Sequence, residues 1–369
     1  MLPKLNRILV VGNEKVESNA IEIANFLAGT QSRKVFLVVS KAFKSYIKAI
    51  VSPDVILVEE KSLFNVYLSM TCKYVFSTHG SSLAGSSKLQ TEVNIWHGVL
   101  YKNIRMLRGE RGIHADFTVG TSPLSVKMFS AAFGVASESV IISGYPRNDM
   151  MLRARKVKTE IKRKVQHDLT RYDKVIFWMP TFRRTEEQGN KNGRFGMELD
   201  NPFQIDGFDV ASFNELLKEQ NTLCLLKPHY FYLTNKEFLQ YSHILMIDDE
   251  WICKQQITLY ELLACTDVLV SDFSSVIIDY ILLDQPIVCF CTDLEEYKRT
   301  QGLYFDNIED WLPTKLVQNQ NDFFKLLRSI LRTGTDPYAE KRRSLLKEFF
   351  TYSDANSSKR IAERVFRSK

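Results

Sequence analysis

Side chains suited to acid–base chemistry and anion binding follow directly after short apolar runs that are typical of buried β-strands. The set combines imidazoles, cations and hydroxyls: His97, Arg147, Thr181, Arg183, Lys227, His229, Ser274 and Ser275. In open parallel sheets, ligands bind outside the carboxyl ends of the strands. Cations and fixed hydrogen-bond donors complement a diphosphate, and histidine adds a group that titrates near neutral pH. The pattern therefore predicts a site for a phosphorylated substrate.

The stretch 266–306 predicts a strand, a tight turn, a buried helix and a second strand. Asp267–Ser271 is a short β-rich run, and Val276–Leu283 is almost wholly apolar. Such a crossover places the start of the helix beside a strand end, where free N–H groups and the helix dipole favour an anion. We expect Ser274 and Ser275 to hold a phosphate group; the simpler interpretation is that they only cap the helix.

Each candidate also has a structural interpretation. His97 follows the expected strand Val93–Trp96 and could simply close a turn, and His79 is expected to be a turn histidine with satisfied hydrogen bonds. Asp272 is expected to orient the serine loop, and Asp279 to pair inside the buried helix. Structural or exposed positions are expected for His114, His167 and His243.

Strand patterns alternate with helical patterns along the chain, which predicts an α/β fold with parallel sheets. The alternation restarts after the Lys- and Arg-rich segment 153–164, so we expect one domain at 1–155 and a second at 156–335. Residues 336–369 predict a charged helix that packs back on the first domain. Gly12 follows the first strand without a GxGxxG pattern, and no dinucleotide site is expected.

Composition limits the class of protein. The chain has 369 residues and a net charge of +6, which suits phosphorylated substrates or an anionic membrane surface but is too weak to indicate nucleic acid. The six cysteines lie mostly in apolar runs without a CxxC pair, which indicates a reducing compartment and neither a disulfide framework nor a zinc site. No run reaches membrane-spanning length, so we expect a cytoplasmic protein that contacts the inner face of the membrane peripherally, if at all.

Five segments together resemble the CDP-glycerol glycerophosphotransferase family, whose members build teichoic acids and related capsule polymers. They occur in order between Val93 and Asp306: NIWHGVLYKNI, GYPRNDMML, IFWMPTFRR, LLKPH, and DVLVSDFSSVIIDYILLDQPIV with DLEEYKRTQGLYFD. The resemblance implies a GT-B-like fold, in which two Rossmann-like domains face each other across a cleft. It makes 1–155 the acceptor side and 156–335 the CDP-alditol-binding domain.

The resemblance also implies roles for individual residues. His97 matches a proposed catalytic base, His229 a histidine implicated at the donor phosphates, and the pair Ser274 and Ser275 a contact to the pyrophosphate. Lys227, Arg183 and Thr181 would join the pyrophosphate site. The remaining residues expected in the cleft are Gly98, Arg147, Asn148, Asp149 and Asp272.

The implied reaction moves an alditol phosphate from a CDP-alditol, with CDP-glycerol the first choice, to a hydroxyl of a lipid-linked or polymeric saccharide. The CDP-alditol is a substrate, and neither a cofactor nor a metal is expected because cationic side chains fill that role. Val99 stands where the family commonly has threonine, and the chain has no long N-terminal extension, so we expect a single or limited transfer.

Two alternatives remain open from the sequence. The first is a GT-B glycosyltransferase that uses a nucleotide sugar, since it would share the fold and the strand-end site. The second is a non-catalytic protein that binds an anionic polymer or a membrane surface through basic residues.

Overall fold

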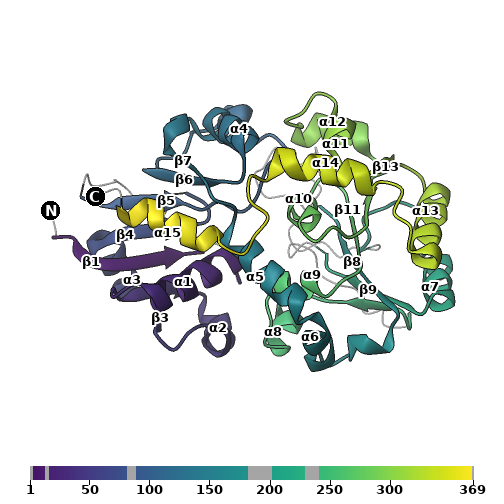
Figure 1. Ribbon diagram of the computed structural model, residues 1–369, viewed down its shortest axis with the longest axis horizontal. Helices are drawn as coiled ribbons and strands as arrows, with labels where there is room; N and C mark the ends of the chain where they lie inside the picture. Colours follow the sequence, from purple (N-terminus) through teal and green to yellow (C-terminus); the bar gives the residue numbers. More distant parts are fainter. Residues whose placement is uncertain (1–2, 13–15, 81–88, 182–201, 229–240, 368–369) are drawn as a thin grey trace.

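The computed structural model describes residues 3–12, 16–80, 89–181, 202–228 and 241–367. They form two lobes that lie side by side, each built on one parallel β-sheet covered by helices (Figure 1). The strands are buried along almost their whole length, which explains why they read as continuous apolar runs rather than as alternating ones. The expected α/β class with two Rossmann-like domains is confirmed.

The sheet of the first lobe has the strand order β3-β2-β1-β4-β5-β6-β7. The strands are β1 Leu5–Val11, β2 Val35–Val39, β3 Val55–Glu59, β4 Cys72–Ser77, β5 Thr91–Asn94, β6 Phe117–Gly120 and β7 Val140–Ile142. At the centre of the sheet Val10 lies opposite both Leu37 of β2 and Phe76 of β4, and the register between β1 and β4 shifts once, between Leu5 and Ile8. The order reverses between β1 and β4, and ligands of open α/β sheets bind at such a reversal point.

The second sheet repeats the arrangement with the order β10-β9-β8-β11-β12-β13. Its strands are β8 Lys174–Met179, β9 Thr222–Leu226, β10 Ile244–Met246, β11 Val268–Ser271, β12 Ile287–Phe290 and β13 Leu316–Val317. Here the order reverses between β8 and β11. The short strand β13 was not expected, because two residues are too few to show a pattern.

Helices cover both sheets and join the lobes. The α-helices of the first lobe are α1 Ser18–Thr30, α2 Lys44–Ile50, α3 Leu63–Thr71 and α4 Pro123–Phe133. Two consecutive helices, α5 Pro146–Lys156 and α6 Lys158–Lys164, lead into the second lobe. There the chain forms α7 Val210–Glu219, α8 Asp249–Lys254, α9 Leu259–Ala264, α10 Val276–Ile281, α11 Leu294–Gln301, α12 Ile308–Trp311, α13 Gln320–Thr333 and α14 Ala339–Phe349.

The last helix, α15 Ser357–Arg367, returns to the first lobe and packs against α1 and α5 (Figure 1, yellow). The carboxylate of Asp149, at the start of α5, accepts from the backbone N–H groups of Ser357 and Ser358, both at 2.8 Å. Asp149 thus caps α15, and the expectation that it faces the cleft is wrong. Because the chain crosses between the lobes at α5–α6 and again before α15, it connects them at two places.

Candidate active site

A cavity of about 320 Å³ lies between the lobes, at the carboxyl ends of the strands where both sheet orders reverse. From the first lobe it is lined by residues 16–18 after β1, by His79 after β4 and by residues 96–102 after β5. From the second lobe it is lined by residues 179–181 after β8 and 273–276 after β11. Two crevices of the kind that binds ligands in open α/β sheets therefore open into one pocket.

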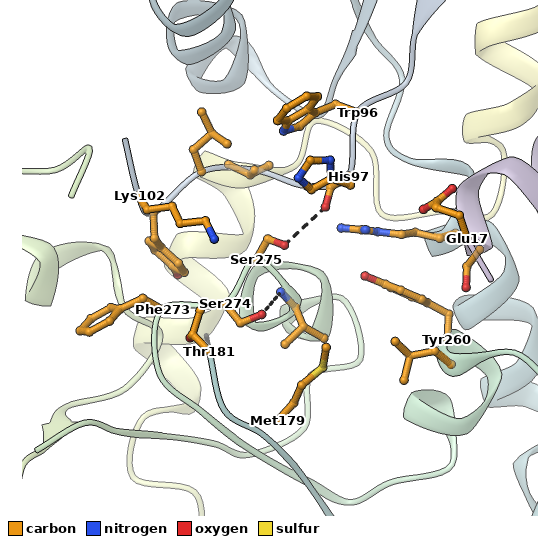
Figure 2. A pocket seen from close by; sticks show the side chains of 18 of the residues that line it. Glu17, Trp96, His97, Lys102, Met179, Thr181, Tyr260, Phe273, Ser274 and Ser275 are labelled. Atoms are coloured by element: carbon orange, nitrogen blue, oxygen red, sulfur yellow. Dashed lines mark hydrogen bonds between the residues drawn. The ribbon is translucent and has the colours of Figure 1, made fainter. Parts of the chain in front are cut away.

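His97 lies in this pocket with its imidazole held in one orientation (Figure 2). Its Nδ1 atom is 3.2 Å from the backbone oxygen of Thr78. Because a carbonyl oxygen can only accept, Nδ1 carries the proton in the neutral ring and Nε2 keeps its lone pair. Burial, with further contributions from His79, Arg147 and Lys102, holds the pKa of His97 well below its ordinary value. The ring is thus neutral near pH 7, as a general base must be.

The chain turns sharply on both sides of His97. β5 ends at Asn94, two residues before the expected end of the strand, because Trp96 adopts a left-handed conformation with φ +60°. The side chain of Asn19 on α1 fixes this turn by donating to the Trp96 carbonyl at 3.1 Å. Gly98 follows with φ +136°, a conformation that favours glycine. The turn places the backbone carbonyl of His97 within reach of the Ser275 hydroxyl of the second lobe.

Gly98 is a point of close contact between the two lobes in the site. A Cβ atom added there would lie 2.6 Å from the Cβ and Oγ atoms of Ser275 and 2.8 Å from Nη2 of Arg147. The Ser275 hydroxyl donates to the His97 carbonyl at 3.4 Å. Figure 2 shows the Ser275 hydroxyl turned toward the His97 carbonyl and the Lys102 ammonium turned toward the serine pair.

The serine pair does not cap α10 in the usual way. Ser275 is the N-cap residue but has helical backbone angles and makes no side-chain cap bond, and Ser274 Oγ is 3.5 Å from the Val276 nitrogen. The helix itself covers only Val276–Ile281, two residues less than expected at its end. Ser275 therefore makes no capping bond, whereas Ser274 accepts a long hydrogen bond from the first N–H of the helix. Both residues also line the pocket.

Arg147 joins the lobes through a buried ion pair. Its Nη2 atom lies 2.5 Å from Oδ2 of Asp279 on α10, and the Tyr260 hydroxyl donates to the same oxygen at 2.6 Å. The guanidinium carbon is 4.8 Å from the centre of the Tyr260 ring. Asp279 was expected to pair internally, near its own helix. It does accept from Tyr260 of the same lobe, but its ion-pair partner Arg147 comes from α5. Arg147 lines the pocket as expected, but Asp279 already balances its charge.

Thr181 and Asp272 lie at neighbouring strand ends of the second sheet. Both the backbone N–H and the hydroxyl of Thr181 donate to Oδ1 of Asp272. Thr181 lines the pocket, whereas Asp272 is almost fully buried behind it. Asp272 thus ties the loop after β8 to the serine loop after β11, which fits the orienting role expected from its position.

Lys227 lies elsewhere. Its ammonium pairs with Asp249 at 3.0 Å, and within the described part of the chain it is not among the residues that line the pocket. It follows β9, which is one strand away from the reversal point, and its role at the pyrophosphate stays a prediction. Asn148 is buried at the start of α5, also away from the pocket lining. Arg183 and His229 lie outside the described residues.

The structure adds pocket residues that sequence reasoning missed. His79, expected to be an ordinary turn histidine, stacks on His97 with ring centroids 4.4 Å apart. Lys102 and Glu17 also line the pocket. The position of His79 directly after a strand was the available signal, but only the strand order shows that β4 flanks the reversal point.

The family model described as CDP-Glycerol:Poly(glycerophosphate) glycerophosphotransferase matches residues 4–367. The chain belongs to this family. Over 291 residues it is 29% identical to the teichoic acid ribitol-phosphate polymerase TarK of Staphylococcus aureus, covering 75% of this chain and 52% of TarK. Over 300 residues it is 26% identical to a teichoic acid glycerol-phosphate transferase of the same species, covering 75% of this chain and 71% of that relative. The chain thus spans about half the length of TarK.

The wall teichoic acid polymerase TagF has a similar fold. The two structures superpose with a TM-score of 0.77 over 98% of this chain and 89% of the TagF chain, at 19% identity. This likeness confirms the GT-B-like arrangement expected for the family. In the described parts of the chain no helix is both long and apolar enough to cross a bilayer. In the same residues, no three His, Cys, Asp or Glu side chains are grouped so that they could hold a metal ion.

Proposed function

We propose that the protein transfers glycerol phosphate, or a related alditol phosphate, from a CDP-alditol to a hydroxyl of a lipid-linked saccharide or a growing teichoic-acid-like polymer, with release of CMP. The observation that carries the proposal is that a neutral His97 and the pair Ser274 and Ser275 line one pocket between two Rossmann-like lobes. Family membership supports the donor class, as does the name of the glycerol-phosphate transferase relative. A variant of TagF has been soaked with CDPG, which agrees with the same donor.

In the proposed reaction, the acceptor oxygen attacks the β-phosphorus of the donor. The bond from that phosphorus to the bridging oxygen breaks, and CMP leaves with the bonding electron pair. Nε2 of His97 takes the proton of the attacking hydroxyl. The hydroxyls of Ser274 and Ser275 and the ammonium of Lys102 stabilise the charge on the phosphate oxygens. No cofactor takes part in this scheme.

CMP release tests the proposal directly. The protein is incubated with an acceptor and with CDP-glycerol, CDP-ribitol or a UDP-sugar, and the products are identified by mass. We expect CMP from a CDP-alditol and no UDP from the sugar donor, and the product mass also gives the number of units added. Release of UDP instead would favour a glycosyltransferase, and turnover of none of the donors would favour a binding protein.

The role of His97 is tested by replacing it with alanine. Loss of a general base lowers the rate by about 10²–10⁴-fold. His114→Ala is the matched control, because the side chain of His114 is 67% exposed and lies outside the pocket lining given by the described residues. A folded His97→Ala variant that keeps the wild-type rate would remove His97 from the mechanism.

We also propose that the protein works at an anionic membrane surface, where a lipid-linked acceptor would be found, and that α3 makes the contact. This helix contains no charged residue, and its stripe Leu63, Val66, Tyr67 and Met70 has the helical spacing of one face yet is exposed to solvent. Leu63 is 89% exposed and Met70 50%. Isolated exposed apolar residues are ordinary, but a contiguous face indicates an interaction surface.

Lysines lie at both ends of α3 and favour an anionic bilayer as its partner; of the two carboxylates that also precede the helix, Glu59 and Glu60, the first pairs with Lys44. Lys61 precedes the helix and Lys73 follows it, and Lys4 donates to the Met70 carbonyl at 2.8 Å. Each lysine near an anionic surface contributes about 1 kcal/mol to binding. The apolar stripe would enter the interface while these ammonium groups meet the lipid headgroups.

Sedimentation with phosphatidylglycerol vesicles and with neutral phosphatidylcholine vesicles tests this surface. We expect binding to the anionic vesicles only, and loss of binding in the double variant Val66→Glu with Met70→Glu. Val157→Glu is the control, since Val157 is 44% exposed and lies between α5 and α6. Equal sedimentation of the double variant and the wild type would exclude α3 as the contact.

A further inference from the structure

His79 and His97 form a stacked pair inside the pocket. Their ring centroids are 4.4 Å apart and their planes differ by 23°. His79 lies in the loop that follows β4, and His97 in the loop that follows β5, so two neighbouring parallel strands deliver one imidazole each. A stacking distance this short between rings from separate loops restricts the plane of each ring.

Thr78 holds both rings at the same time. Its backbone oxygen accepts from Nδ1 of His97 at 3.2 Å, and its hydroxyl lies 3.0 Å from Nδ1 of His79. Thr78 is fully buried. The three residues therefore form a rigid unit in which Nε2 is the only ring nitrogen of His97 left for an acceptor. The reaction described above uses His97 but assigns no role to His79.

We propose that His79 is a positioning residue: by stacking on His97 it fixes the plane of the base so that Nε2 faces the acceptor hydroxyl, and it limits the pair to a single positive charge. The inference deepens the proposed function and depends on it for the role of His97. The limit on charge follows from the 4.4 Å between the ring centroids, because two imidazolium rings in contact would repel each other.

The surroundings of the pair agree with this assignment. Burial, with a smaller contribution from Arg105, lowers the pKa of His79 to about 4. The positive charges of Lys102 and Arg147 act on His97 and disfavour its protonation. Glu17 is a carboxylate in the pocket lining that carries the opposite charge. Two neutral rings at neutral pH leave His97 free to accept the proton of the substrate.

Two substitutions test whether His79 acts by stacking on His97 or only by forming the turn after β4. His79→Ala removes the ring, and we expect kcat to fall by about 10–100-fold with KM for CDP-glycerol changed less than about twofold, as for loss of an oriented group. His79→Phe keeps a planar ring that cannot titrate, and we expect it to restore most of kcat. The acid limb of the pH–rate profile should move to higher pH in His79→Ala, because solvent then reaches His97.

Nitrogen NMR of the His97 ring gives a readout that needs no turnover. We expect a single Nδ1–H tautomer in the wild type and in His79→Phe, and a mixture of tautomers in His79→Ala. Melting temperatures establish that each variant is folded, and the phenylalanine variant keeps the test possible if the alanine variant does not fold.

The possible failures are distinguishable. If no CDP-alditol is turned over by the wild type, the proposed function fails, while the NMR comparison still decides whether His79 orients His97. The positioning role is overturned if His79→Ala keeps the wild-type kcat, pH limb and tautomer. It is also overturned if His79→Phe is as impaired as His79→Ala, since the ring nitrogen rather than stacking would then matter.

Discussion

The ion pair between Arg147 and Asp279 provides a quantitative test of how the lobes are held together. The side chains are only 7% and 2% exposed, and the two charged atoms are 2.5 Å apart. Asp279→Asn removes the negative charge but keeps an amide oxygen that can accept from Tyr260. The guanidinium then remains buried without a counter-ion, and its Nε atom already has no hydrogen-bond partner among the described residues.

Breaking a buried pair by removing one partner costs about 3–5 kcal/mol. Since the amide oxygen of the new asparagine still accepts one hydrogen bond, we expect the lower end, about 3 kcal/mol, as the loss in free energy of unfolding. Urea unfolding followed by tryptophan fluorescence measures this loss as a lower midpoint. The double variant Arg147→Met with Asp279→Leu should recover most of the loss, because apolar residues of similar volume remove both desolvation penalties.

The matched control is Glu295→Gln. Glu295 pairs with Lys298 at 2.8 Å on α11, but the two side chains are 83% and 38% exposed. A surface pair of this kind contributes about 0–1 kcal/mol, so the midpoint should hardly move. The reasoning is refuted if Asp279→Asn costs less than about 1 kcal/mol, the range of a surface pair, or if the apolar double variant is no more stable than the single one.

Two other substitutions have outcomes that the structure fixes. Gly98→Ala should destabilise the protein by about 2–4 kcal/mol and reduce CMP release, because the added methyl group meets Ser275 and the backbone is strained. The control is Gly29→Ala on α1, where the added methyl group has open space around it. This control should be neutral or slightly stabilising in the same urea-unfolding measurement. Burial raises the pKa of Glu22 to about 7 from its ordinary 4.5 despite its bond to Arg153. The folded protein thus binds the proton of Glu22 more tightly than the unfolded chain does. The stabilisation from this proton is fully present below pH 4.5 and is lost as the pH rises to about 7. Relative to Glu22→Gln, unfolding free energies measured across this window should fall by on the order of 2–3 kcal/mol in the wild type, and parallel curves for the two proteins would contradict the assignment.

The sequence by itself determined most of the strands and the residue types at their ends. The expected strand Asp267–Ser271, for example, differs by only one residue from β11 in the structure, because a buried parallel strand is apolar along most of its length. The restart of the pattern after residue 164 indicated the two lobes. The motifs around His97 and Ser274 indicated the family, which the match over residues 4–367 confirms.

Tertiary structure decided which strand ends face the pocket. Strand order depends on contacts between distant segments, and nothing local distinguishes β4, which flanks the reversal point, from β9, which does not. For that reason His79 was taken for a turn residue, and its place beside His97 in the pocket was missed. The partners of Arg147 and Asp149 were equally hidden, since each is bound by a residue more than a hundred positions away. A polar residue's type shows what it can bind, but only the packing of the chain shows what lies within its reach.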